Sequence, residues 1–587
     1  MKTYINAFLI LFLSCQFVYA QAPVVTTVSP QRQILNAPRG TAITVNFNTS
    51  LNTSSVNNST FRVFGKQSGP IPGTFEFLNG NLQIKFTPSS LFLAGEWVTV
   101  SLSKGIQSQD NTPMALGYSW NFWTIAGFGT LNQSLIRTIP VRRQGEGLIQ
   151  CYGALGVDLN DDGKTDLAVV NEISEDFRVF LNNGVSYDTI FAIIPIPNGS
   201  YPSPSEAGDF NHDGKVDIIV GNVGNNILSL FLATGNANYS TGVSYTAGNN
   251  VRGVGIADLD GDGHDDIITA NRGGSNISIF KSNGDGTFTS AVNSNTVGNG
   301  ETAVMMTDAN NDGITDAFIG CYSSSEIVLL LGDGNGNFNF SSRSSLNGNP
   351  WAIVVGDMNG DGNADVAAAL SSANKIGVIF GNGSGGLGSV TTYTSGQFPL
   401  AIDIGDVDGD NDLDLIASDY GSGDYKVYGN NGSGVYTNSP ITLQASSAGS
   451  CITVHDRDND GDLDLSGIDE VDDLLFLFVN GPGPQGINMV SNEIPASYSL
   501  YQNYPNPFNP VTKIKFNIAP IVNGELLMVN LKIFNAAGQE IAAIVNENVS
   551  PGSYEVSWDA SAFASGIYFY SLEAGDYKET KRMILLK

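Results

Sequence analysis

The sequence predicts an all-β protein, in which a seven-bladed β-propeller is flanked by an N-terminal Ig-like β-sandwich and a small C-terminal β-sandwich. Three observations predict this fold class. An acidic nine-residue motif recurs seven times at nearly constant spacing. Short apolar and β-branched runs alternate with turns rich in Gly, Asn and Ser, which is the pattern of strands. Gly accounts for 68 of 587 residues, and the 3.6-residue periodicity of a helical solenoid is absent.

Residues 1–20 have the features of a secretory signal peptide. Lys2 supplies the positive start, an apolar run follows over 7–12, and Ala20 ends a small-residue cleavage site. An alternative interpretation makes Cys15 the acylated residue of a lipoprotein. Both interpretations predict export. No later segment has ~18 consecutive apolar residues, so we expect no transmembrane helix in the mature chain.

The overall charge is strongly acidic. Asp and Glu number 57 against 27 Lys and Arg, which gives a formal net charge of −30. An acidic surface repels nucleic acid and anionic membranes, and we therefore expect no nucleic-acid partner. Three cysteines follow the signal peptide, Cys151, Cys321 and Cys451, too few for a disulfide framework. A single Cys151–Cys451 bond remains a weaker hypothesis, because both residues precede loops of neighbouring blades.

We predict that residues 24–125 form the first β-sandwich. Alternating apolar and polar residues, as in 42–47, 82–86 and 97–102, indicate about seven strands in ~100 residues. The segment resembles the bacterial Ig-like domains of surface proteins. A spacer role and a ligand-binding role both remain open for it.

Residues 130–485 predict the propeller. The motif D-x-[DN]-x-D-[GN]-x-x-D occurs seven times, and the first residues of successive copies are 51, 49, 50, 49, 49 and 50 positions apart. Four strand-like runs in ~50 residues form one blade. The run 135–141, which precedes the first motif, resembles the fourth strands elsewhere. We predict that it is the outer strand of the seventh blade and so closes the ring, removing a pair of sheet edges.

The acidic motifs predict calcium sites, numbered here as loops one to seven. Ca²⁺ takes six to eight hard oxygen ligands, and a tight loop turns the side chains of positions 1, 3 and 5 inward. Position 9 adds a carboxylate and position 7 a backbone carbonyl. Position 6, which is Gly in six loops and Asn411 in the other, needs a positive φ. Zn²⁺ would require His or Cys, and His212 and His264 occupy variable positions.

We therefore expect about seven calcium ions, with acidic loops that bind no metal as the alternative. The predicted ligands at positions 1, 3, 5 and 9 are Asp158, Asn160, Asp162 and Asp166; Asp209, Asn211, Asp213 and Asp217; Asp258, Asp260, Asp262 and Asp266; Asp308, Asn310, Asp312 and Asp316; Asp357, Asn359, Asp361 and Asp365; Asp406, Asp408, Asp410 and Asp414; and Asp456, Asp458, Asp460 and Asp464.

These loops, of which residues 357–365 are an example, resemble the FG-GAP/VCBS repeats found in the propeller of integrin α subunits. The resemblance covers roughly residues 130–490. It implies that the loops bind calcium and brace the propeller. The Phe-Gly and Gly-Ala-Pro signatures of integrins are mostly missing, so the resemblance is not extended to an integrin ligand or partner.

The C-terminal part begins with a linker rich in Pro and Asn, predicted over 486–510. The stretch 504–510 reads YPNPFNP, and strand-like runs follow to a basic C-terminus. Residues 500–587 resemble the C-terminal sorting domain of proteins secreted by the type IX system. The resemblance implies the type IX machinery as a partner, passage across the outer membrane, and a location at the cell surface or outside the cell.

The sequence shows no catalytic motif, and we expect no enzymatic activity. Three functions remain: an adhesion or recognition module for a protein or surface polysaccharide, a lectin with repeated sugar pockets, and, less favoured, a calcium-assisted polysaccharide lyase or hydrolase. Repeated exposed aromatic residues would favour a lectin. Phe288, Phe338 and Tyr436 recur after Gly-rich turns, and we expect them to pack between blades.

Overall fold

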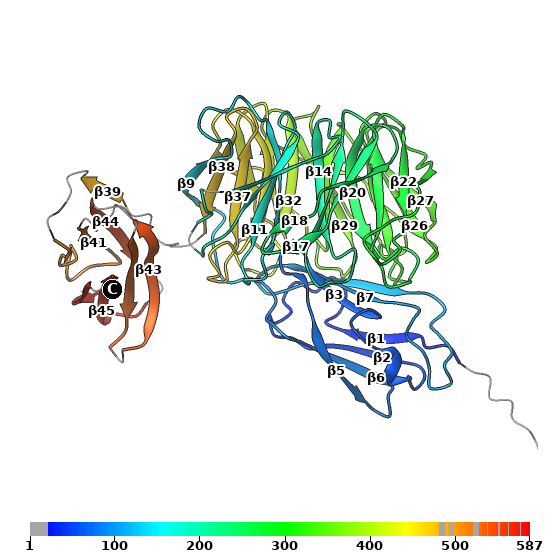
Figure 1. Cartoon of the computed structure of the whole chain (residues 1–587), viewed down its shortest axis with the longest axis horizontal. Helices are drawn as coiled ribbons and strands as arrows, with labels where there is room; N and C mark the ends of the chain where they lie inside the picture. The colour runs from blue at the N-terminus through cyan, green and yellow to red at the C-terminus, as the bar shows by residue number, and fades with distance from the viewer. Residues whose placement is uncertain are drawn as a thin grey trace, which may run out of the picture.

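The computed structural model describes residues 21–587 except 185, 190, 481–487, 492–494, 496, 520–526, 537, 550–551, 561–562 and 576. The predicted signal peptide lies outside the described residues. In the described part, regular structure is β apart from one 3₁₀ turn, η1 (Thr53–Ser55) (Figure 1). The all-β fold class is confirmed. Within the same part of the chain, no helix is long and apolar enough to cross a membrane.

The N-terminal domain is a sandwich of two four-stranded antiparallel sheets. One sheet has the order β1 (Val25–Ser29), β2 (Ile43–Phe47), β6 (Gln83–Pro88) and β5 (Gly73–Leu78). The other has the order β4 (Gly69–Pro70), β3 (Phe61–Gly65), β7 (Trp97–Leu102) and β8 (Tyr118–Trp123). Alternate residues of β2, Ile43, Val45 and Phe47, face the core, as the two-residue period of a strand requires.

The repeat region forms a β-propeller with seven four-stranded sheets among the described residues. From inner to outer strand, the sheets are β10 (Cys151–Val157), β11 (Asp166–Asn171), β12 (Asp176–Phe180), β13 (Ala192–Pro195); β14 (Pro202–Gly208), β15 (Asp217–Asn222), β16 (Ile227–Phe231), β19 (Val243–Thr246); β20 (Val251–Ala257), β21 (Asp266–Asn271), β22 (Asn276–Phe280), β23 (Val292–Ser294); β24 (Glu301–Thr307), β25 (Asp316–Cys321), β26 (Glu326–Gly332), β27 (Phe338–Ser345); β28 (Pro350–Gly356), β29 (Asp365–Leu370), β30 (Lys375–Ile379), β31 (Thr391–Thr394); β32 (Pro399–Gly405), β33 (Asp414–Asp419), β34 (Asp424–Tyr428), β35 (Ile441–Gln444); and β36 (Gly449–His455), β37 (Asp464–Asp469), β38 (Leu474–Val479), β9 (Ser134–Pro140). A small hairpin of β17 (Ala233–Gly235) and β18 (Asn238–Tyr239) extends the second sheet's turn.

The ring closes as predicted. Strand β9, which precedes the first acidic loop, pairs with β38 of the last sheet, for example Ile139 with Leu475. The inner strands also pack in sequence around the ring, and β10 contacts both β14 and β36. The second strand of every sheet is buried along its whole length. These buried strands account for the short continuous apolar runs of the repeats.

The hypothesis of a Cys151–Cys451 disulfide is wrong in this structure, where both residues are free cysteines. The Cys151 thiol donates to the carbonyl oxygen of Asp469 at 3.2 Å. The Cys451 sulfur accepts from the Ala154 N–H at 3.4 Å. The two residues lie on neighbouring inner strands, but Cys451 faces a residue three positions further along β10 than Cys151.

The C-terminal domain is a second small sandwich. One sheet has the order β39 (Asn488–Ser491), β44 (Gly552–Asp559), β41 (Val511–Ile518) and β40 (Ser499–Leu500). The other has the order β43 (Glu540–Val549), β42 (Leu527–Phe534), β45 (Gly566–Ala574) and β46 (Tyr577–Leu585). Strands β39 and β40 lie inside the segment predicted as a linker. Their partners come later in the chain, so short strands of this kind have no local signal.

The N-terminal domain packs against one end of the propeller, the end that carries the acidic loops (Figure 1). Each inner strand starts at the opposite end and runs toward its loop. The two ends of the propeller are therefore different surfaces, one covered by the Ig-like domain and one open.

Candidate functional site

The acidic loops share one backbone conformation. Position 6 has a positive φ in all seven loops, from 70° at Asn411 to 103° at Gly461, which confirms the prediction for this position. Position 4 has a positive φ as well, which the sequence analysis missed. Its occupants are Asp161, His212, Gly261, Asn311, Gly360, Gly409 and Asn459. Gly, Asn, Asp and His are the residue types that adopt this conformation most readily. The residue types at position 4 could therefore have predicted its positive φ.

The Asp at position 1 stabilises each loop by accepting hydrogen bonds from backbone N–H groups of the same loop. In loop five, Asp357 accepts the N–H groups of Asp361 at 3.0 Å and Gly362 at 2.7 Å. The bond to the position 6 N–H recurs in all seven loops. Asp361 at position 5 accepts from Asn363 at 2.9 Å. Both carboxylate oxygens of Asp357 therefore accept backbone N–H groups within the loop.

The Asp at position 9 has a role that the sequence did not reveal. In loop five, Asp365 accepts the N–H of Met358 at 3.1 Å and the N–H of Gly381 at 2.8 Å. The second bond, to the N–H sixteen residues later, occurs in all seven loops. Each position 9 carboxylate therefore ties the acidic loop to the hairpin that leaves the third strand of its blade.

Three loops bring their carboxylates together. Oxygens of Asp258, Asp260 and Asp262, of Asp406, Asp408 and Asp414, and of Asp456, Asp458 and Asp460 lie within 4.8 Å of one another. These are the loops with Asp at position 3. In the other four loops, position 3 is Asn160, Asn211, Asn310 or Asn359, whose amide oxygen is also a hard ligand but carries no charge.

Buried carboxylate oxygens in these three loops lack a hydrogen-bond partner among the described residues. They are Oδ1 of Asp260, Asp408, Asp412, Asp456, Asp458 and Asp462, whereas Oδ2 of Asp464 lies 3.3 Å from the Arg457 guanidinium. Burying an unpaired carboxylate oxygen is costly unless a cation compensates it. The donor set consists of oxygens only, which fits a hard divalent cation such as Ca²⁺ better than Zn²⁺.

Burial raises the pKa of the position 9 carboxyls. The pKa is about 7 for Asp166 and about 8 for Asp266, Asp365 and Asp414, mainly because of burial and secondarily because of neighbouring carboxylates. A cation bound in the loop would favour the ionised form and lower these pKa values again.

Two further acidic residues join the candidate sites. Asp412 and Asp462 occupy position 7 of loops six and seven, where the sequence analysis expected only a backbone carbonyl. Both side chains are buried. Burial, with the adjacent carboxylates, raises the pKa of Asp412 to about 7 and that of Asp462 to about 8. Loops six and seven therefore contain five carboxylates each.

Loop seven differs from the others because it contains a buried cation at position 2. Arg457 at position 2 is fully buried, and its guanidinium lies 3.1 Å from Asp458 and 3.3 Å from Asp464. The other six loops have an apolar residue at this position. The seven loops are therefore not equivalent as ion sites, although the motif is the same.

The Ig-like domain binds directly to the loop backbones. The N–H groups of Lys104 and Ser119, and that of Gly127 just after the domain, donate to the carbonyl oxygens of Gly261, Gly313 and Gly461 at 2.7, 2.7 and 2.6 Å. Arg62 forms an ion pair of 2.6 Å with Asp265 in loop three. The conformation of the loops and the position of the Ig-like domain on the propeller are therefore coupled.

The open end of the propeller carries a cluster of aromatic and charged side chains around the axis. The Trp351 indole N–H donates to the Tyr152 hydroxyl at 2.7 Å. The Arg252 guanidinium lies 5.1 Å from the Trp351 ring centroid, within cation–π range. These three side chains come from the starts of β10, β20 and β28, at the end of the propeller opposite the acidic loops.

Half-buried aromatic residues extend the cluster on one side. Tyr322 and Phe398 lie 5.4 Å and 5.7 Å from Trp351, and Tyr420 lies 6.2 Å from Phe398 between ring centroids. Arg272 covers the Tyr322 ring at 4.4 Å. We call Tyr152, Arg252, Arg272, Tyr322, Trp351, Phe398 and Tyr420 the axial mouth cluster.

A second position of the repeat could have revealed part of this cluster from the sequence alone. The residue fourteen positions after the first Asp of each loop is Glu172, Val223, Arg272, Tyr322, Ser371, Tyr420 and Glu470. This row varies strongly while the loops stay constant, which is the pattern of a ligand surface on a fixed scaffold. Gln150 donates to both Glu172 and Glu470, at 2.9 and 2.7 Å.

The aromatic residues that the sequence analysis considered have the packing role expected of them. Phe288 and Tyr436 are buried. They stack edge-on against Phe210 and Tyr393. Phe338 is half-buried against the core between two blades.

Comparison with known proteins identifies all three parts. Residues 158–220, 209–269, 258–319, 308–368, 357–417 and 406–465 match the model of an FG-GAP-like repeat, and together they span more than half of the chain. The chain belongs to the FG-GAP-like repeat family. In this FG-GAP-like protein, residues 20–124 match a bacterial Ig-like domain, and residues 502–586 match a secretion system C-terminal sorting domain. The sorting domain indicates export by type IX secretion to the cell surface or the extracellular space.

Solved structures similar to this FG-GAP-like protein have low identity. A functionally unknown protein from Desulfotomaculum acetoxidans is 13% identical, with 66% of this chain and 97% of that chain covered and a TM-score of 0.33. The periplasmic gluconolactonase PpgL of Pseudomonas aeruginosa is 14% identical, with 59% and 94% covered and a TM-score of 0.42. A Lactobacillus plantarum protein is 12% identical, with 67% and 98% covered and a TM-score of 0.35. No curated protein matches.

Proposed function

We propose that this protein is a calcium-braced recognition module of the cell surface, which binds its ligand at the open end of the propeller. The single observation that carries this proposal is the axial mouth cluster. Its aromatic side chains are half-buried, so each keeps some exposed surface for a ligand, and the opposite end of the propeller carries the Ig-like domain. Export through the sorting domain places the module where surface ligands are found.

Calcium is proposed for the acidic loops because the side chains at positions 1, 3, 5 and 9 all offer oxygens and several buried oxygens have no other partner. Ca²⁺ tolerates irregular coordination, whereas Mg²⁺ demands an octahedron. The residues that would hold the ion are those at positions 1, 3, 5 and 9, with Asp412 and Asp462 added in loops six and seven. The bound ion would neutralise the clustered carboxylates and hold the loops in the conformation that seats the Ig-like domain.

A polysaccharide is the ligand class that the cluster favours. Aromatic faces stack on the apolar faces of sugar rings, and arginine and carboxylate groups bond to hydroxyl groups. The three aromatic residues between blades are packed in the protein interior or against it, so they favour one axial site over repeated sugar pockets. We further propose that the site binds without cleaving, because Glu172 and Glu470 are both held by Gln150.

The proposal is tested by retention of the purified chain on a panel of immobilised polysaccharides, with calcium and after removal of calcium. We expect retention on at least one polymer, and we expect Trp351→Ala to abolish it. Phe340→Ala is the matched control, because Phe340 is 50% exposed on an outer strand away from the mouth. Equal retention of the two variants would contradict the axial site, and retention of neither parent nor variants would contradict a polysaccharide ligand.

A further inference from the structure

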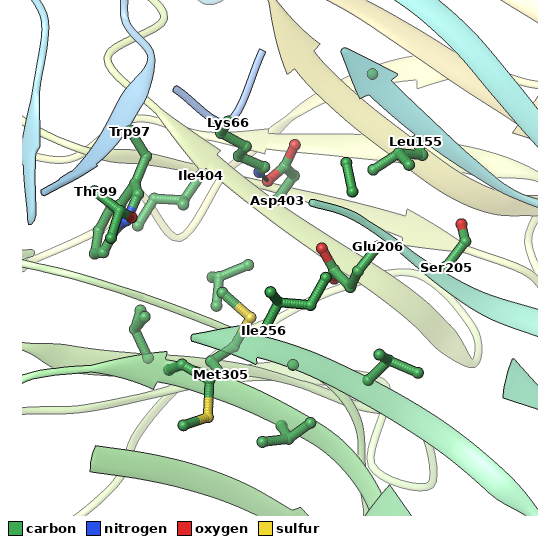
Figure 2. A pocket seen from close by; sticks show the side chains of 18 of the residues that line it. Lys66, Trp97, Thr99, Leu155, Ser205, Glu206, Ile256, Met305, Asp403 and Ile404 are labelled. Carbon is green, nitrogen blue, oxygen red and sulfur yellow. Dashed lines mark hydrogen bonds and ion pairs between the residues drawn. The ribbon is translucent and has the colours of Figure 1, made fainter. Parts of the chain in front are cut away.

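A cavity of about 350 Å³ lies on the propeller axis between the inner strands and the Ig-like domain (Figure 2). We call it the axial chamber. Its wall is mostly apolar, with Ile256, Met305 and Ile404 from three different inner strands and Trp97 from the Ig-like domain. Ligand pockets typically have ~300–1,000 Å³, and a dry apolar cavity of about 150 Å³ suffices for benzene. The chamber is therefore large enough for a small organic molecule.

The charged groups of the chamber leave one carboxylate without a partner. Lys66 Nζ lies 3.0 Å from Asp403 Oδ1, and the other oxygen of Asp403 accepts the Val454 N–H at 2.9 Å. Arg62 is paired with Asp265. Glu206 projects into the same space (Figure 2), and the described residues give its side chain no hydrogen bond and no ion pair.

Counted together, the lining has two cationic and three anionic side chains, and thus an excess of one negative charge. Burial raises the pKa of Glu206 to about 7, and the attraction of the Lys66 ammonium only partly offsets this rise. An unpaired carboxylate in apolar surroundings is unfavourable unless a cation joins it.

A second polar group in the chamber wall is also unsatisfied. The Trp123 indole N–H is buried and has no acceptor among the described residues. Trp97 and Trp123 are in edge-to-face contact, with ring centroids 5.0 Å apart. Aromatic walls favour organic cations over metal ions, because the cation can lie against the ring face while its apolar body replaces water.

We propose that the axial chamber is a binding site for a small organic ammonium ion, an apolar body with one protonated amino group that pairs with Glu206. The negative excess selects for the cation, the apolar wall accepts the body, and the volume limits the size. The site is separate from the acidic loops, and it does not depend on the function proposed for the axial mouth cluster.

The axial mouth cluster lies directly above this chamber. Tyr152, Arg252 and Trp351 precede Ala154, Val254 and Ile353 of the chamber wall by two residues on the same strands. The distance along the strand is ~7 Å, and each strand has a register irregularity at the first residue of the pair. Tyr152, Arg252 and Trp351 also contact one another, so they form the boundary between the chamber and the open end of the propeller.

The test uses the purified full chain and three probes of similar size: n-hexylammonium, n-hexanol and hexanoate. Titration calorimetry is performed above the pKa of about 7 of Glu206. We expect hexylammonium to bind with one molecule per chain, and the neutral and anionic probes to bind at least about tenfold more weakly, the ratio that corresponds to one modest ion pair. Glu206→Gln should lower hexylammonium affinity about tenfold and leave hexanol unchanged. Glu76→Gln, which changes an exposed carboxylate of the Ig-like domain outside the chamber, is the control and should change neither.

A crystal soaked in 6-bromohexylammonium gives a second measurement that does not depend on any variant. Anomalous signal from bromine in the chamber, with the amino group at Glu206, supports the proposal. Failure of all three probes to bind at millimolar concentration, equal affinity of the three, an unchanged hexylammonium affinity in Glu206→Gln, or bromine found only outside the chamber would each overturn it.

Discussion

The position 9 carboxylate of each loop should stabilise its blade even without calcium, and Asp365→Ala is the clearest perturbation. The substitution leaves the N–H groups of Met358 and Gly381 without their acceptor. Met358 is buried and Gly381 is half-buried. A buried donor left unpaired costs ~1–3 kcal/mol, and water can reach the Gly381 N–H, so we expect a total loss of about 2–4 kcal/mol in the blade's local stability.

Hydrogen exchange of the metal-stripped chain measures this loss where it occurs. A change of ~2 kcal/mol raises the opening equilibrium about thirtyfold. Asp361→Ala is the matched control, because Asp361 is exposed at position 5 and accepts only one local N–H. It should change the metal-free exchange by less than ~0.5 kcal/mol, while both variants should lose the protection that added calcium gives to loop five. Equal metal-free exchange in the two variants would refute the proposed clamp.

Three further predictions follow from the loops. The pKa of Asp266 and of Asp365 is about 8 in the folded metal-free chain and ~3.9 in the unfolded chain. The metal-stripped chain should therefore lose stability as the pH rises from about 5 to about 8, and added calcium should reverse this pH dependence. Melting scans over this range would contradict the argument if stability changed with pH in the same way with and without calcium. Arg457→Leu should raise the calcium affinity of loop seven, because it removes a cation that lies 3.1 Å from Asp458; unchanged affinity in a calcium titration would count against this. Arg62→Ala should weaken the seat of the Ig-like domain, seen as faster exchange of 97–102, because it breaks the 2.6 Å pair with Asp265; unaltered exchange would argue against that anchor.

Features that repeat along the chain could be predicted from the sequence. The seven copies of one motif predicted the propeller, the loops and the positive φ of position 6. The strand-like run at 135–141, which precedes the first motif, predicted that β9 closes the ring. Each of these is visible because the same residue types recur at the same register, so a local pattern is enough.

Features that depend on contacts between distant segments could not be predicted. The second bond of Asp365 reaches an N–H sixteen residues away, and Arg457 lies inside loop seven although it occupies a position that is apolar elsewhere. The mouth cluster and the chamber exist only because inner strands from different blades meet on one axis. Glu206 looks like an ordinary exposed strand residue in the sequence, and its isolation becomes visible only when Lys66 of the Ig-like domain pairs with Asp403 instead.

The central claim is that the acidic loops bind calcium, and the most direct measurement is the metal content of the chain after equilibrium dialysis against calcium, determined by plasma mass spectrometry. We expect several calcium ions per chain, at most about seven, and the loss of one ion when Asp258, Asp260 and Asp262 are together changed to Asn. A chain that retains no calcium, or a variant whose calcium content equals that of the parent, would contradict the account.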